Sequence, residues 1–133
     1  MRNWMLAVVL AVGLTGAVNA QDAEIEGVIG SQIEAFQADD FIGAFEFAHP
    51  SIRNIFRTPE NFGRMVTQGY PMVWRPAEVT YLELRDVGGD LRQKVQIVDM
   101  DGAVHLLDYR MRKTADGWKI SAVQLLAASE LSA

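Results

Sequence analysis

The polar side chains that could do chemistry lie among apolar residues in the second half of the chain. Gln93, His105, Tyr109 and Gln124 all fall on the apolar side of alternating segments. An imidazole can exchange a proton near neutral pH, and phenol and amide groups can orient a ligand by hydrogen bonding. No nucleophile or orienting carboxylate accompanies His105 at a recognisable spacing, so a structural histidine is favoured over a catalytic one.

These four residues predict a site for a small apolar ligand at the mouth of a cavity. The alternative is that they only satisfy one another. Tyr70 and Trp74 lie between prolines in the segment that joins the two halves of the chain. They are candidates for the cavity rim, and the alternative for them is a hydrophobic plug, since large aromatics usually serve packing.

Metal and cofactor sites are not expected. The chain has no cysteine, and His49 and His105 are in no metal-ligand spacing. Asp99, Asp101 and Gly102 belong to a turn that lacks the other ligands of a calcium loop. We therefore predict no cofactor and no metal, with His49 as a helix cap or surface residue. We expect a noncatalytic domain that binds a small ligand or a protein partner.

The N-terminus has the pattern of an export signal. Arg2 precedes an uncharged run over residues 5–18, and residues 18–20 end in small side chains. The run is shorter than the roughly 20 apolar residues of a membrane span, and Gly13 and Gly16 interrupt it. We predict a cleaved signal peptide at 1–20 and a single mature domain at 21–133, periplasmic or secreted and without membrane attachment.

Charge limits the partners of the mature chain. Twelve basic and 17 acidic residues give a net charge of −5, and loss of Arg2 takes the mature charge to −6. Nucleic acid and anionic membranes are therefore not expected partners. Arg53 and Arg57 share a helical face and could meet an anionic ligand, although a solvated face is the usual meaning of such a pair.

The first half of the mature chain predicts helices. Asp39 or Asp40 is expected to end the first helix and cap a short second one. Pro50 and Pro59 suit the first position of two further helices, with Thr58 as the cap before Pro59. The apolar stripe of the first helix is expected to consist of Ile25, Val28, Ile29, Ile33 and Phe36.

From Glu78 onward, apolar residues alternate with polar ones, which predicts an antiparallel meander of four strands. A two-residue turn at Gly88-Gly89 would pair Leu84 with Gln93 and Leu82 with Val95. A bulged loop of three residues, 100–102, would then pair Val95 with Leu107 and Lys94 with Asp108. The face covered by helices is expected to carry Leu82, Leu84, Gln93, Val95, Ile97, His105, Leu107, Tyr109, Met111, Trp118, Ile120, Ala122 and Gln124.

The opposite sheet face predicts self-association. Its apolar residues would form a patch larger than monomers usually expose, which a homodimer would cover. The alternative is that residues after Leu126 fold back over it. The residues expected on this outer face are Val79, Tyr81, Val98, Val104, Leu106, Val123 and Leu125.

Helices followed by a meander predict an α+β fold with helices on one side of a curved sheet. This order resembles the nuclear-transport-factor-two-like, or cystatin-like, superfamily. The segments DDFIGAFEFAHPSI, FGRMVTQGYP and GAVHLLDYRM are similar to a secreted bacterial family, domain of unknown function 4864. The resemblance implies a cone-shaped fold that often pairs through its sheet. It also leaves open an isomerase, lyase or hydrolase-like enzyme with a polar site inside the cone.

Overall fold

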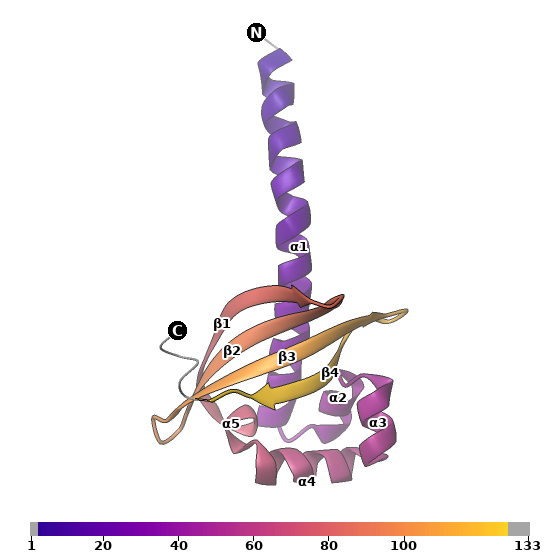
Figure 1. The fold of residues 1–133 in the computed structure, drawn as a ribbon, viewed down its shortest axis with the longest axis vertical. Coiled ribbons are helices and arrows are strands. Elements are labelled where there is room, and N and C mark those ends of the chain that lie inside the picture. The colour runs from indigo at the N-terminus through magenta and orange to yellow at the C-terminus, as the bar shows by residue number, and fades with distance from the viewer. Residues whose placement is uncertain (1–2, 128–133) are drawn as a thin grey trace.

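A computed structural model describes residues 3–127, with side chains from residue 20 onward. Helices lie on one side of a curved four-stranded antiparallel sheet of order β1-β2-β3-β4, so the α+β prediction is confirmed (Figure 1). No helix within this part of the chain combines the length and apolar character of a membrane span. The elements are α1 Asn3–Gln37, α2 Phe41–Glu46, α3 Pro50–Phe56, α4 Pro59–Gly69, α5 Pro71–Trp74, β1 Pro76–Val87, β2 Asp90–Asp99, β3 Val104–Thr114 and β4 Gly117–Leu125.

The predicted apolar stripe of α1 forms one side of the core. Ile25, Ile29, Ile33 and Phe36 are buried, and Val28 is partly buried against them. Steps of three and four residues place these side chains on one face of the helix, which packs against the sheet. The predicted signal peptide at 1–20 overlaps the start of α1, and its cleavage stays a prediction.

Short-range side-chain caps start α2, α3 and α4, as predicted. The Asp40 carboxylate accepts a hydrogen bond from the Gly43 amide at 3.0 Å and caps α2. His49 Nδ1 accepts one from the Ser51 amide at 3.1 Å before α3. Thr58 Oγ1 caps α4 through the Asn61 amide, also at 3.1 Å. Each cap satisfies an amide that has no partner inside its own helix.

Glycines in positive-φ conformations shape the two predicted hairpins. Gly88 and Gly89 form the two-residue turn with φ of 62° and 91°. Gly102, with φ of 86°, ends the three-residue loop between β2 and β3. Val95 pairs with Leu107 and Lys94 with Asp108, which confirms this part of the register.

A bulge in β1 overturns the predicted position of Leu82. Tyr81, not Leu82, pairs with Val95, and the register then shifts before Leu84 pairs with Gln93. The extra residue reverses the alternation, so Tyr81 and Val79 join the core while Leu82 is 41% exposed. The predicted pairing of Leu82 with Val95 is therefore wrong.

A second shift, in β4, overturns the predicted position of Gln124. Arg110 pairs with Ala122 but Met111 with Ile120, which leaves Ser121 as an extra residue. The Ser121 hydroxyl donates to the Arg110 carbonyl at 3.2 Å. Gln124 consequently pairs with Asp108 on the outer face and is exposed, so its predicted inward direction is wrong.

These shifts also reduce the expected apolar patch on the outer face. Val79, Tyr81 and Val123 pack against the core, and Leu125 pairs with the buried Leu107. Of the seven expected residues, Val98, Val104 and Leu106 remain outside, and Leu106 is itself buried. The homodimer stays an untested prediction, and the apolar surface that could form its interface is smaller than expected. The alternative, in which residues after Leu126 cover this face, concerns residues that lie mostly outside the described part of the chain.

Candidate functional site

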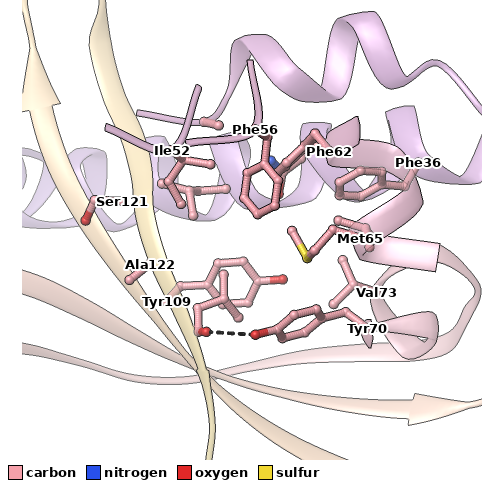
Figure 2. Close-up of a pocket in the computed structure, with 15 residues that line it drawn as sticks. Phe36, Ile52, Phe56, Phe62, Met65, Tyr70, Val73, Tyr109, Ser121 and Ala122 are labelled. Carbon is pink, nitrogen blue, oxygen red and sulfur yellow. Dashed lines mark hydrogen bonds between the residues drawn. The ribbon is translucent and has the colours of Figure 1, made fainter. Parts of the chain in front are cut away.

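A cavity of about 410 Å³ lies between the helices and the inner side of β3 and β4 (Figure 2). Its lining is mainly apolar, and the side chains of Ile52, Phe56, Met65 and Tyr70 are only partly buried. Ile52 and Phe56 lie on α3, Met65 lies on α4, and Tyr70 is the residue at the C-terminal end of α4. We therefore place the mouth of the cavity on the side of α3 and α4. The lining residues are Gln32, Phe36, Ala48, Ile52, Phe56, Phe62, Met65, Val66, Tyr70, Val73, Tyr109, Ile120, Ser121, Ala122 and Val123.

Phenylalanines build the helical wall of the cavity. The Phe62 ring lies 5.7 Å from Phe36 and 5.8 Å from Phe56, measured between ring centroids. Phe45 packs on the same ring from α2 at 5.3 Å. Tilted ring pairs at these distances are favourable beyond the area they bury. The wall is therefore well supported from three other helices.

Tyr109 is the polar residue at the inner end of the cavity. Its side chain is fully buried, and its hydroxyl has no hydrogen-bond partner among the described residues. Burial, followed by the nearby Tyr81 and Tyr70, raises the pKa of Tyr109 above its ordinary value. The phenol therefore stays protonated and offers a hydrogen-bond donor without an acceptor. Figure 2 shows it pointing into the space between the phenylalanines and Tyr70.

Tyr70, Gln32 and Ser121 are the other polar residues of the cavity lining. The Tyr70 hydroxyl donates to the Val123 carbonyl at 3.4 Å, shown as the dashed line in Figure 2. Gln32 Nε2 donates to the Ala44 carbonyl at 3.2 Å, and Gln32 is buried. Sequence reasoning missed Gln32, although its position three residues after Ile29 and four before Phe36 marks it as part of the buried stripe.

Gln93 serves the sheet and does not line the cavity. It is buried on the inner face, as predicted, but its Nε2 donates to the Leu82 carbonyl at 3.0 Å and to the Lys94 carbonyl at 2.9 Å. The first of these carbonyls belongs to the β1 bulge. Gln93 therefore supplies donors where the bulge interrupts the regular ladder.

His105 lies at the β2–β3 loop, away from the cavity lining. Its Nε2 is 2.8 Å from Asp99 Oδ2, while Asp99 Oδ1 accepts from the amides of Asp101 and Ala103, each at 2.9 Å. The hydrogen bond from His105, followed by that from Ala103, lowers the pKa of Asp99. This arrangement organises the loop, which agrees with the structural interpretation of His105.

Trp74 belongs to a clamp at the end of α1. Its Nε1 donates to Asp39 Oδ1 at 2.8 Å, and the Arg75 guanidinium lies 4.1 Å from the centroid of its ring. Arg75 also binds the Asp39 carboxylate at 3.1 Å and donates to the Phe36 and Gln37 carbonyls. The Trp74 hydrogen bond, then that from Arg75, lowers the pKa of Asp39.

Of the six site residues predicted from sequence, the cavity thus brings together Tyr70 and Tyr109. Gln93, His105, Trp74 and Gln124 lie elsewhere. In the described part of the chain, no group of three or more histidine or acidic side chains is placed to hold a metal ion. The arrangement can bind an apolar molecule and donate one hydrogen bond to it.

Fold and site together define a small α+β domain with an apolar cavity between its helices and its sheet. The chain belongs to the family described as Domain of unknown function (DUF4864), whose model matches residues 18–133. Neither a curated protein nor a solved structure shows a match to the chain.

Proposed function

We propose that this protein is an exported, noncatalytic binding domain that holds a small, mainly apolar ligand in the cavity. The observation that carries the proposal is the Tyr109 hydroxyl, which lies at the inner end of an apolar space of about 410 Å³ and has no hydrogen-bond partner in the described part of the chain. Ligand pockets commonly have volumes of roughly 300–1,000 Å³ and combine apolar walls with a few polar groups. The ligand would carry a carbonyl, ether or hydroxyl oxygen as the acceptor for Tyr109.

Tyr109 can meet a ligand only after a small rearrangement. Its side chain has no exposed surface, so a neighbouring side chain must move before a ligand oxygen reaches the hydroxyl. Met65 is suited to such movement because its side chain is unbranched and flexible, and it is only partly buried.

Binding is proposed over catalysis because of the groups that line the cavity. Its lining residues include two tyrosines, a serine and a glutamine, but no carboxylate and no imidazole among those described. A protonated tyrosine can polarise a ligand oxygen, whereas an isomerase or lyase also needs a group that accepts a proton. His105, the candidate base of the alternative enzyme, is held by Asp99 outside this lining.

Membership of the nuclear-transport-factor-two-like superfamily is part of the proposal. The order of helices and strands and the curved sheet across α1 support it (Figure 1). Export is also part of it and rests on the charge, length and small-residue ending of residues 1–20. Intact-mass measurement of the protein recovered from the periplasm tests export, since a mass that retains Met1 to Ala20 would contradict it.

Ligand binding is tested by native mass spectrometry of the mature protein purified from its own periplasm, and by titration with the neutral dye 1-aminoanthracene. We expect a retained small molecule or saturable dye binding. Met65→Trp should weaken binding at least about tenfold by filling the mouth of the cavity, a loss of roughly 1.4 kcal/mol.

Gln68→Trp is the matched control, because Gln68 is exposed on the same helix and does not line the cavity. Absence of both a retained molecule and dye binding in the wild-type protein would contradict the proposed function. Equal binding by the two tryptophan variants would mean that the ligand binds outside the cavity.

A further inference from the structure

A row of three arginines crosses the outer face of the sheet, opposite to the cavity. Arg85 on β1 pairs with Arg92 on β2, and Arg92 pairs with Arg110 on β3. All three share the face of Asp108 and Lys94, because their neighbours Leu84, Gln93 and Tyr109 point inward. Residues directly opposite on adjacent strands have β-carbons roughly 5 Å apart. The three arginine side chains therefore leave the backbone along one short line that crosses three strands.

Carboxylates neutralise the ends of this row but not its centre. Arg85 forms an ion pair with Asp108, which is buried. Asp90 lies 3.7 Å from Arg110 and 3.6 Å from Arg112, measured from carboxylate oxygen to Nε. Arg92, between two other arginines, has no ion pair in the part of the chain that the structure describes.

The surrounding face has a surplus of positive charge. Lys94, the remaining cation beside the row, pairs with Glu83 at 3.2 Å. Among the described residues, five cations, counting Arg112, thus face three carboxylates, a local excess of two positive charges on a chain whose net charge is −5. Like charges directly opposite in a sheet are destabilising, so folding alone does not favour this arrangement.

The arginines also have unused donors. Nε of Arg85, Arg92 and Arg110 is buried and has no hydrogen-bond acceptor among the described residues. Buried donors without partners are costly, more so when they are charged. Local conflicts of this kind are expected at functional sites.

We propose that the arginine row binds a dianionic oxyanion, phosphate or sulfate, free or as the phosphate group of a small ester, seated over Arg92. Guanidinium groups match the oxygens of such anions in a bidentate manner. The excess of two positive charges corresponds to one dianion. Extended polyanions fit less well, because the net negative charge of the whole chain repels them.

Calorimetric titration of the mature wild-type protein with sodium sulfate and sodium phosphate, at constant ionic strength set by chloride, tests this site. We expect saturable binding of one anion with a dissociation constant below about 1 mM. Glycerol 3-phosphate is the third ligand. If glycerol 3-phosphate binds more tightly than phosphate, the site is assigned to a phosphate ester. If the two bind equally, the site is assigned to the free anion. Both results support the proposal.

Arg92→Gln should weaken sulfate binding at least tenfold, and Arg92→Lys should weaken it less, because lysine keeps the charge without the planar fork. Arg64→Gln is the matched control and should bind as wild type, because Arg64 is exposed on α4, on the helical side of the sheet. Two results would overturn the proposal: no binding by the wild-type protein up to about 10 mM sulfate, or unchanged affinity in both Arg92 variants. The wild-type titration decides the matter even where a variant does not fold.

Discussion

Replacing Tyr109 by phenylalanine should stabilise the protein in the absence of ligand. The hydroxyl is buried and has no hydrogen-bond partner within residues 20–127, and an unsatisfied buried hydroxyl costs about 1–3 kcal/mol. Removing it leaves a small void, whose cost is below roughly 1 kcal/mol. The free energy of unfolding should therefore rise by about 1 kcal/mol, equivalent to a melting temperature about 4 °C higher for a domain near 100 residues.

Tyr70→Phe is the matched control for this experiment. It removes a hydroxyl that does donate, to the Val123 carbonyl at 3.4 Å, so unfolding should become easier by about 0.5–1 kcal/mol. Urea unfolding followed by tryptophan fluorescence measures both variants, and equal m-values would show that the midpoints report stability.

A Tyr109→Phe variant less stable than the wild type would contradict this prediction. Such a result would mean that the Tyr109 hydroxyl has a partner. The same variant should bind the cavity ligand more weakly than wild type, so greater stability with weaker binding is the combination that the cavity predicts.

Three further predictions concern the clamp, the β2–β3 loop and the β1 bulge. Arg75→Ala should lower the free energy of unfolding by about 1–2 kcal/mol, mostly through the lost hydrogen bonds to the Phe36 and Gln37 carbonyls, because its ion pair with Asp39 is largely exposed; an unchanged urea midpoint would contradict the clamp. The pKa of Asp99 is lowered in the folded state, so ionised Asp99 adds to the free energy of unfolding above the unfolded pKa of about 3.9, and this stabilisation is lost as the pH falls through the folded pKa. Asp99→Asn should therefore make stability fall less steeply below about pH 4. An equally steep fall in acid titrations of both proteins would argue against this. Tyr81→Ala should lower the free energy of unfolding by at least about 2 kcal/mol and Leu82→Ala by less than about 1 kcal/mol, because Tyr81 packs in the core and Leu82 is exposed. The reverse order in thermal unfolding would contradict the bulge and favour the regular register.

Local signals in the sequence determined the helix starts and the hairpin turns. Asp40, His49 and Thr58 each cap a helix through an amide only two or three residues away, so no distant contact is needed to recognise them. Gly88-Gly89 and Gly102 adopt positive φ, which glycine tolerates better than other residues. The buried stripe of α1 is also recognisable in the sequence, because a helical period is visible without knowing what covers it.

Tertiary packing decided which face each strand turns inward. In β1, both alternating sets contain apolar residues, with Val79 and Tyr81 in one and Leu82 and Leu84 in the other. The bulge brings Val79, Tyr81 and Leu84 inward together, and the Tyr81 hydroxyl then reaches the Glu26 carbonyl of α1 at 3.3 Å. No pattern within the strand could choose this arrangement.

The same holds for the candidate sites. In β4, the extra residue at Ser121 allows Ile120 and Val123 both to face the cavity, which removes Gln124 from it. Tyr109 was recognisable from its alternation, but the absence of a partner for its hydroxyl depends on side chains from α1, α4 and β4. The sequence by itself thus indicated the elements and one polar residue of the cavity, whereas the cavity and the row of arginines exist only because separate strands and helices meet.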